Sequence, residues 1–385
     1  MLRSLNSLNA RTDGPRIAVA FPRRISAPPH EVASHCHLTQ RLAILLGRDF
    51  IVDYDPLVRN TVDNIYYVPY RTLVEPGAAG STEEQLMNLS GLHDLFGGVV
   101  PYPFVGTKAI THSLVDRDAR APIGWSKKFG EHVRQAVLQG ATVFSPEDAR
   151  RAGAVLIRAG PVRIKPVLGI GGRGQNVVES QSALNDAIEE QNATELNDCG
   201  LVLEQHLDDV CTYSVGHVSV GDLVVTYVGT QSLTRDNAGE MVYGGSDLLF
   251  ARGEFEALLA INLTDAEREA VRLARIYDAA ALRCYPGLYA SRRNYDVAQG
   301  KDIWGRVRTG VLEQSWRAGG ASVAEACALE AFHRAPDLRT LRAFTCERYG
   351  AQHPQPAPAQ LVYRGQDTEI GFITKYGGIS SYGDK

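Results

Sequence analysis

Short apolar runs alternate with longer amphipathic stretches over the first hundred residues of the chain. The runs at 17–21, 50–54 and 64–68 are rich in β-branched and aromatic residues, which is typical of buried strands. Apolar residues recur at helical spacing over 31–46 and 83–96, and each of these stretches ends at a glycine. Strands that alternate with helices predict a small α/β layer with a parallel sheet.

Helix caps and turn residues punctuate the remainder of the chain. Ser145, followed by a proline, predicts a helix start, and Thr264 with Glu267 predicts a capping box for a long helix. The Gly-Asp pair at 221–222 predicts a hairpin turn between two strands. Further helices are predicted at 127–138, 182–191, 324–333 and 338–347, and further strands at 162–165, 176–178, 201–204, 289–297, 310–313 and 361–363.

Breaks in this pattern divide the chain into five predicted segments. Prolines after residue 100 mark the end of the first domain. A second proline-rich stretch, at 352–359, separates a C-terminal tail from the rest of the chain. The first residues lack the apolar stretch of a secretion signal, which favours a disordered leader. The predicted segments are a leader at 1–14, an α/β domain at 15–105, two subdomains at 106–200 and 201–350, and a linker with a tail at 351–385.

The composition excludes several classes of protein. Of the 385 residues, 44% are hydrophobic and 22% are charged, with a net charge of −4, so we expect a globular protein that binds no nucleic acid. No window is long and apolar enough to span a membrane. The six cysteines show no paired metal or redox spacing, which predicts reduced thiols and a cytoplasmic location.

The stretch between Lys165 and Gln175 carries the clearest chemical signal. A β-branched run ends in lysine and proline and then opens into four glycines, which are Gly169, Gly171, Gly172 and Gly174. Glycines let a loop bring its backbone N–H groups close to an anion, and phosphate is the usual guest. Lys165 would add a flexible ammonium beside that cradle.

Two other nucleotide-binding loops share glycines of this kind. The spacing satisfies the dinucleotide-binding fingerprint, but that fold requires the loop to open directly into a helix. Here a β-like run at 175–179 follows the loop, which argues against it. A protein-kinase loop is also disfavoured, because the chain contains neither His-Arg-Asp nor Asp-Phe-Gly.

Further features accompany the loop in a set order along the chain. A lysine pair at 127–128 precedes it, and Glu204 ends a predicted strand after it. Asp296 and Glu313 then lie on two consecutive predicted strands. This order resembles the ATP-grasp superfamily over residues 127–320. The resemblance implies an α/β (α+β) ATP-grasp fold, with an N-terminal Rossmann-like domain in front of it.

The resemblance also implies a nucleotide site with named residues. The glycine loop would fold over the terminal phosphates of ATP, and two lysines would bind those phosphates. The end of the strand at Glu204 would contact the edge of the adenine base. The implied nucleotide contacts are Lys128, Lys165, Gly171, Gly172, Gly174, Gln175, Glu204, Gln205, Leu207 and Asp209. Asp209 is the weakest of these, because Cys211 stands where family members carry the ribose-binding acid.

A metal and catalytic set follows from the same resemblance. Mg²⁺ needs hard oxygen ligands, and two carboxylates that bridge phosphates suffice. The implied ligands are Asp296, Glu313 and Ser315, for one or two Mg²⁺ ions, with Mn²⁺ as an alternative; the implied catalytic residues are Lys165, Arg293 and Arg317. Ser315 replaces the family's asparagine, and Asn294 stands where many members have an arginine.

ATP-grasp enzymes activate a carboxylate as an acyl phosphate, which a nucleophile then attacks. The resemblance therefore implies an ATP- and Mg²⁺-dependent ligase that joins a small-molecule carboxylate to an amine or similar nucleophile, and it leaves a homodimer open. Two alternatives remain, a biotin-carboxylase-like enzyme that activates bicarbonate and a degenerate ATP-binding regulator. Segments 235–237 and 243–247 are candidates for lining the acceptor pocket, and as plain turns they are equally well explained. Segment 375–378 either reaches the site or forms a disordered end.

Overall fold

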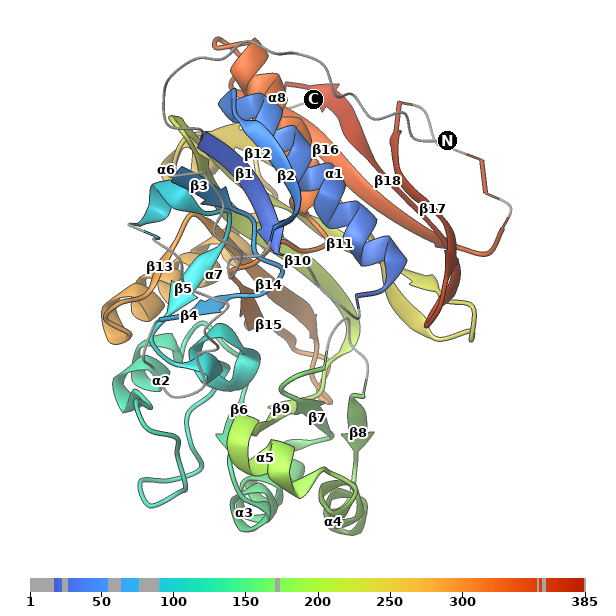
Figure 1. Cartoon of the computed structure of the whole chain (residues 1–385). Coiled ribbons are helices and arrows are strands. Elements are labelled where there is room, and N and C mark those ends of the chain that lie inside the picture. Colours follow the sequence, from blue (N-terminus) through green and yellow to red (C-terminus); the bar gives the residue numbers. More distant parts are fainter. Residues whose placement is uncertain are drawn as a thin grey trace.

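Four sheets organise the described part of the chain (Figure 1). The computed structural model describes residues 17–22, 27–54, 64–75, 89, 91–169, 174–351, 353–354 and 358–383. The predicted leader and the glycines Gly171 and Gly172 lie outside these ranges. Within the ranges, no helix is long and apolar enough to cross a membrane.

The N-terminal layer is a parallel sheet in the order β2-β1-β3, as predicted. Its strands are β1 (Ile17–Pro22), β2 (Asp49–Tyr54) and β3 (Asn64–Tyr67). Helix α1 (Pro29–Leu46) connects the first two strands and ends at Gly47, whose φ of 63° is one that glycine adopts without steric cost. Most of the predicted helix at 83–96 lies outside the described residues, and its described end is a 3₁₀ turn at Leu92–Asp94.

A second small sheet joins this layer to a later part of the chain. It has the order β13-β5-β4, with β4 (Leu73–Val74), β5 (Gly98–Val100) and β13 (Tyr289–Ala290). Two 3₁₀ turns then follow, η3 (Pro103–Gly106) and η4 (Lys108–Thr111). The N-terminal segment is therefore tied to the strand region that carries the predicted metal ligands.

The sheet that carries the glycine loop has four strands in the order β6-β9-β7-β8. They are β6 (Gly140–Val143), β7 (Val162–Pro166), β8 (Asn176–Val178) and β9 (Leu201–Gln205). Strand β8 pairs back on β7 as the predicted hairpin, so the loop is a strand-to-strand connection. Three helices pack on this sheet: α3 (Pro146–Leu156), α4 (Gln181–Glu189) and α5 (Ala193–Cys199).

The largest sheet has eight antiparallel strands in the order β15-β14-β10-β11-β12-β16-β18-β17. Its strands are β10 (Asp208–Val220), β11 (Leu223–Arg235), β12 (Met241–Arg252), β14 (Arg292–Lys301), β15 (Val307–Ser315), β16 (Thr340–Tyr349), β17 (Gln360–Asp367) and β18 (Gly371–Tyr382). The predicted hairpin turn at 221–222 joins β10 to β11.

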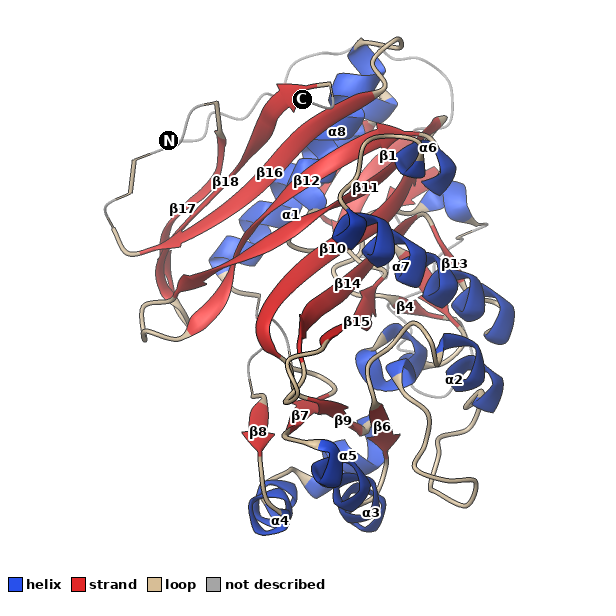
Figure 2. Cartoon of the chain, turned by 180° about the vertical axis from the view of Figure 1, so that it is seen from behind, coloured by secondary structure: helices blue, strands red, loops and turns tan. Residues whose placement is uncertain are grey.

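Helices cover the two faces of this sheet differently (Figure 2). On one face lie α6 (Phe255–Leu259) and α7 (Asp265–Cys284), and Tyr295 of β14 contacts Tyr277 of α7. On the other face lie α1 and α8 (Ser322–Arg334), and Arg292 of β14 binds Glu325 of α8. Because side chains alternate along a strand, Asp296 shares the face of Arg292. We call these the α7 face and the α8 face.

Three predicted elements differ from the structure. The predicted helix at 338–347 is strand β16, which is paired on both sides by β12 and β18. The predicted helix at 127–138 is shorter, because α2 (Lys127–Val133) ends before Val137 forms a bridge to Val311. The segment 243–247 lies within strand β12 and is not a turn.

Candidate active site

Two carboxylates face each other at the open end of the α8 face. Asp296 of β14 and Glu313 of β15 are direct partners in the antiparallel register, so their side chains leave the same face. The amide Nε2 of Gln231 donates a 2.7 Å hydrogen bond to Asp296 Oδ1. Burial and the nearby charge of Glu313 raise the pKa of Asp296 to about 7.

This carboxylate pair fits a divalent cation. Two neighbouring carboxylates repel each other, and this repulsion falls when a cation binds between them. Carboxylate oxygens are also the ligands that Mg²⁺ prefers. The described residues contain no group of three or more His, Cys, Asp or Glu side chains that could hold a metal. The remaining coordination positions would therefore belong to phosphate oxygens and water.

Lys108 is the lysine that the structure brings to this pair. It begins the turn η4, its side chain is 5% exposed, and its Nζ lies 3.0 Å from Glu313 Oε2. The same Nζ donates a 2.8 Å hydrogen bond to the carbonyl of Gly169, where the glycine loop begins. Thr107 caps the turn by accepting a hydrogen bond from the backbone N–H of Ala109. Lys108 thus links the carboxylates to the loop.

The sequence pointed to Lys128 for this role, and the structure places that residue elsewhere. Lys128 is exposed near the start of α2, and its neighbour Lys127 donates to the carbonyl of Arg117. Sequence separation from Lys165 favoured the 127–128 pair. The signal for Lys108 was its place directly after Gly106 and Thr107, a cap residue that follows the proline break.

Lys165 and Glu204 form a buried ion pair at the centre of the loop-bearing sheet. They lie on adjacent strands β7 and β9, and Lys165 Nζ is 3.3 Å from each carboxylate oxygen of Glu204. His112 Nε2 lies 3.0 Å from Glu204 Oε2. Burial raises the pKa of Glu204, but the charge of Lys165 and the His112 contact outweigh it and lower the pKa to about 2. Glu204 therefore holds Lys165 in place.

At the end of β9, two backbone N–H groups already have hydrogen-bond partners within the protein. The N–H groups of Gln205 and His206 donate to the carbonyls of Gln139 and Pro161, at 2.7 and 3.0 Å. Leu207 is buried. An adenine edge placed here would therefore meet the carbonyl side of Gln205 and the backbone of Leu207.

The far end of the glycine loop is tied to the same segment. Arg163 of β7 donates to Gln175 Oε1 at 3.1 Å through one guanidinium nitrogen, and its other nitrogen lies 3.0 Å from His206 Nδ1. Gly174, at φ 73°, makes the turn into β8. Both described ends of the loop are thus anchored, one through Lys108 and the other through Arg163.

Asp209, the predicted ribose contact, has a left-handed backbone. Its φ is 51°, which non-glycine residues seldom adopt, and its exposed carboxylate binds Lys301 Nζ at 2.9 Å. It lies at the irregularity where β10 begins to pair with β14.

Ser315 and Arg317 lie next to the carboxylate pair at the end of β15. Ser315 is the register partner of Asn294, two positions along from the Asp296–Glu313 pair, so it shares their face. Arg317 is half-buried and donates to the carbonyl of Ala318. Burial and the charge of Arg292 lower the pKa of Arg317.

Arg293, the other predicted catalytic arginine, lies on the opposite face of the sheet. Its Nη1 binds both carboxylate oxygens of Asp278 on α7, at 3.0 and 2.8 Å. Arg293 and Asp296 are three positions apart, and an odd separation along a strand places two side chains on opposite faces of the sheet. Of the two adjacent arginines on β14, Arg292 lies on the α8 face, and the strand alternation alone would have favoured it.

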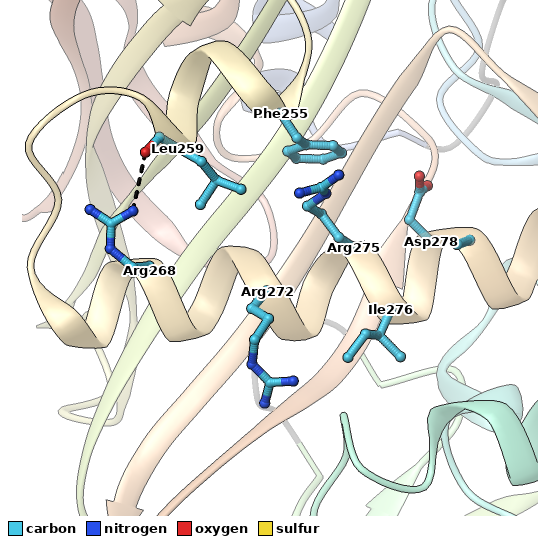
Figure 3. A pocket seen from close by; sticks show the side chains of 8 residues that line it. Phe255, Leu259, Arg268, Arg272, Arg275, Ile276 and Asp278 are labelled. Atoms are coloured by element: carbon cyan, nitrogen blue, oxygen red, sulfur yellow. Dashed lines mark hydrogen bonds between the residues drawn. The ribbon is translucent and has the colours of Figure 1, made fainter.

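A groove of about 680 Å³ lies on the α7 side of the molecule, and its lining includes Asp278 but neither Asp296 nor Glu313 (Figure 3). Its arginines have partners: Arg272 binds Glu269, Arg275 binds Glu256, and Arg268 donates to the carbonyl of Leu259. The lining residues are Phe255, Leu259, Arg268, Arg272, Arg275, Ile276, Asp278 and Ala279. We assign the candidate site to the α8 face, because the groove contains none of the paired carboxylates and lysines described above.

Comparison with solved structures shows the same fold. The biotin carboxylase domain of the 2-oxoglutarate carboxylase from Hydrogenobacter thermophilus, solved as a dimer with MgADP and bicarbonate, superposes with a TM-score of 0.52 at 13% identity. The match covers 94% of this chain and 86% of that chain. This architecture is the ATP-grasp fold, as the sequence predicted.

Two further solved structures are similar over most of the chain. Biotin carboxylase from Campylobacter jejuni matches at 11% identity and a TM-score of 0.48, over 94% of this chain and 87% of that chain. The D-alanyl-alanine synthetase A from Vibrio cholerae matches at 12% identity and a TM-score of 0.45, over 83% of this chain and 94% of that chain.

Sequence comparison gives a family rather than a characterised relative. No curated protein matches the chain. A family model described as "Protein of unknown function (DUF3182)" matches residues 18–377, which include every described residue of the candidate site. The chain therefore belongs to the DUF3182 family, and it has the ATP-grasp fold.

Proposed function

We propose that this protein is an ATP- and Mg²⁺-dependent ligase that activates a small-molecule carboxylate as an acyl phosphate for attack by an amine. The observation that carries the proposal is the cluster of Asp296, Glu313 and Lys108, from which Lys108 reaches the start of the glycine loop. Carboxylates for a cation, lysines for phosphates and a glycine loop are the parts that phosphoryl transfer needs.

Each residue has a task that its surroundings support. Asp296 and Glu313 would hold Mg²⁺, which would neutralise charge on the transferring phosphoryl group. Lys108 and Lys165 are both buried and both held by carboxylates, so their ammonium groups are pre-positioned for phosphate oxygens. Arg317 would neutralise the acyl phosphate or the substrate carboxylate.

The proposed reaction has two steps that balance in atoms and charge. A carboxylate oxygen of the substrate attacks the γ-phosphorus of ATP, the bond from that phosphorus to the β–γ bridging oxygen breaks, and ADP leaves. The amine then attacks the acyl carbon, the carbon–oxygen bond to phosphate breaks, and phosphate and the amine proton leave. No side-chain nucleophile is required, so positioning and charge neutralisation make up the protein's contribution.

Hydroxylamine makes this proposal testable before the amine is known. It traps an acyl phosphate as a hydroxamate, so the protein is incubated with ATP, Mg²⁺ and hydroxylamine together with single members of a carboxylate panel. We expect hydroxamate and ADP to appear in equal amounts with a subset of the carboxylates. Asp296→Asn should abolish both products, and Glu190→Gln, a change at an exposed carboxylate of the loop-bearing segment, should leave them unchanged.

Bicarbonate activation is the second candidate, because the structure that matches with a TM-score of 0.52 was solved with MgADP and bicarbonate. ATP hydrolysis that depends on bicarbonate and forms no hydroxamate with any carboxylate would favour it. ATP binding without turnover under every condition would instead favour a regulator. The predicted domain boundaries and the homodimer stay predictions.

A further inference from the structure

The side chain of Ser315 points to a cluster of positive charge. Arg292 Nη1 lies 3.4 Å from Ser315 Oγ and donates to the backbone carbonyl of the same residue at 3.0 Å. A side chain built on Gly319 would meet Arg317 Nη1 at 3.8 Å, Ser315 Oγ at 3.9 Å and Arg292 Nη2 at 4.0 Å. Two guanidinium groups and the serine hydroxyl therefore surround one point.

Arg292 is held so that it cannot move away. Its side chain is 1% exposed, and Glu325, which is 0% exposed, binds both its Nε and its Nη2 at 2.8 to 3.0 Å. Tyr227 donates a 2.6 Å hydrogen bond to the same carboxylate. Arg292 Nη1 also donates to the carbonyl of Arg317. A buried guanidinium with this many partners keeps one position and one charge.

This arrangement bears on how many cations the site can hold. A divalent ion bound to an oxygen lies about 2 Å from it, so an ion on Ser315 Oγ would lie within about 5.5 Å of the Arg292 guanidinium nitrogen. Like charges at such a distance in a buried setting repel strongly. At Asp296 and Glu313 the ammonium of Lys108 is also near, but there two carboxylates face a single positive charge, and Gln231 and Lys108 each contact only one oxygen.

We propose that the site binds a single divalent ion, between Asp296 and Glu313, and that the fixed charge of Arg292 excludes a second ion from Ser315. The inference rests on the proposed function, because it concerns the cation that accompanies the nucleotide. Arg292 acts here as a positioning residue that also holds the backbone of Ser315 and Arg317. Ser315 is then an anion-facing hydroxyl and no metal ligand.

The experiment counts ions directly. The full chain is saturated with the non-hydrolysable ATP analogue AMP-PNP and titrated with Mn²⁺, while electron paramagnetic resonance follows free Mn²⁺ and reports spin coupling between neighbouring ions. We expect one bound Mn²⁺ per bound nucleotide, without a coupled signal, up to millimolar Mn²⁺. Ser315→Asn, which supplies a longer oxygen ligand, should also bind one ion, because Arg292 is still present.

A variant without the charges of Arg292 and Glu325 tests whether Arg292 excludes the second ion. Arg292→Met combined with Glu325→Gln removes both charges and keeps an oxygen that can accept from Tyr227. Together with Ser315→Asn, this variant should bind a second Mn²⁺ and show the coupled signal. The matched control is Arg41→Met with Glu330→Gln, which neutralises the Arg–Glu pair that joins α1 to α8 and should keep one ion. Circular dichroism and thermal melting check that each variant is folded.

The outcomes separate the inference from the function on which it rests. Two ions in the unaltered chain, or in Ser315→Asn alone, would overturn the inference and leave the nucleotide site standing. A folded triple variant that still binds one ion would show that Arg292 excludes nothing. Absence of AMP-PNP binding in every protein would overturn the proposed function, and the single-ion inference with it.

Discussion

At the scale of single residues, burial distinguishes the side chains of the proposed site from similar ones elsewhere in the chain. Lys108 and Lys128 have the same charge, but only Lys108 is buried and contacts a carboxylate of the site. Asp296, Glu313, Lys165 and Glu204 could be named from the sequence, because each lies on a predicted strand and the four follow one another in a recognisable order. Lys108 and Arg292 were not named, although the sequence held a local signal for each of them. The contacts that single them out, with Glu313 and Gly169 for Lys108 and with Glu325 for Arg292, join residues that are remote in sequence.

The two lysines allow a direct test of the site. We expect Lys108→Met to weaken ATP binding roughly 10- to 100-fold, since a buried charge-assisted contact to phosphate is lost. Lys128→Met should change the affinity less than about twofold, because its ammonium is exposed. Isothermal titration calorimetry with AMP-PNP measures both. The reverse order of effects would restore Lys128 to the phosphate site.

Glu204 gives a prediction about pH and stability. Its pKa in the folded protein, about 2, lies below the usual value of 4.5, so its ionised form stabilises the fold at neutral pH. This stabilisation, about 3 kcal/mol, should disappear as the pH falls from about 4.5 towards about 2. Urea unfolding at a series of pH values measures it.

The matched variants for this prediction remove either the pair or an unrelated acid. Lys165→Met with Glu204→Met should flatten the acid limb of the stability profile, because both buried charges are gone. Glu190→Gln, at an exposed position, should keep the profile of the unaltered chain. If all three profiles coincide, Glu204 does not contribute to acid sensitivity.

At the scale of elements, caps and turns were predictable and long-range pairing was not. The capping box at Thr264, the hairpin turn at 221–222 and the glycine loop between two strands all follow from local chemistry. Strand β16 was predicted as a helix because its residues suit either element. Pairing with β12 and β18 decides the outcome, and both partners are remote in sequence.

Glycines in β11 and β12 illustrate the same limit. The sequence suggested a turn at 243–247, whereas the structure uses glycine in both strands where neighbouring strands approach closely. A side chain at Gly229 would come within 1.9 Å of the carbonyl oxygen of Asp247, and one at Gly245 within 2.1 Å of that of Thr345. The reason for each glycine is a contact with the neighbouring strand.

The close approach at Gly229 predicts a large loss of stability on substitution. Gly229→Ala should lower the free energy of unfolding by about 3 kcal/mol or more, because backbone atoms must separate. Gly239→Ala meets nothing within 4 Å and should cost only about 1 kcal/mol, through its φ of 88°. Chemical denaturation compares the two. Equal losses would mean that the strands move apart at Gly229 at little cost, and that crowding there is not important.

The capping box of α7 predicts a smaller and separate effect. The Thr264 hydroxyl accepts from the backbone N–H of Glu267, and the Glu267 carboxylate accepts from the backbone N–H of Thr264. Thr264→Ala should cost about 1 kcal/mol, and Thr264→Ser, which keeps the hydroxyl, should cost much less. A thermal melt that does not distinguish the two would show that the cap contributes nothing.

At the scale of the whole molecule, the C-terminal strands are part of the main sheet. Strand β18 lies between β16 and β17, and its residues Ile373 and Tyr376 are buried. A chain that ends at Gly350 would leave β16 with an open edge and remove these buried side chains. We expect it to be insoluble or to melt far below the full chain.

A longer truncation product serves as the control for that experiment. A chain that ends at Gly383 keeps all of β18 and should melt like the full chain. Soluble, cooperatively folding protein from the chain that ends at Gly350 would show that the last strands are an independent tail, as the sequence alone suggested.

The packing of α1 against α8 has a consequence for synthesis. Arg41 of α1 is buried and binds Glu330, which follows it by 289 positions in the chain. At a translation rate of 5–20 residues per second, roughly 15 to 60 seconds pass between the emergence of the two side chains from the ribosome. During that interval the nascent N-terminal layer carries an unmatched cation on the helix face that α8 will later cover. The beginning of this protein cannot complete its own fold until most of the chain has been made.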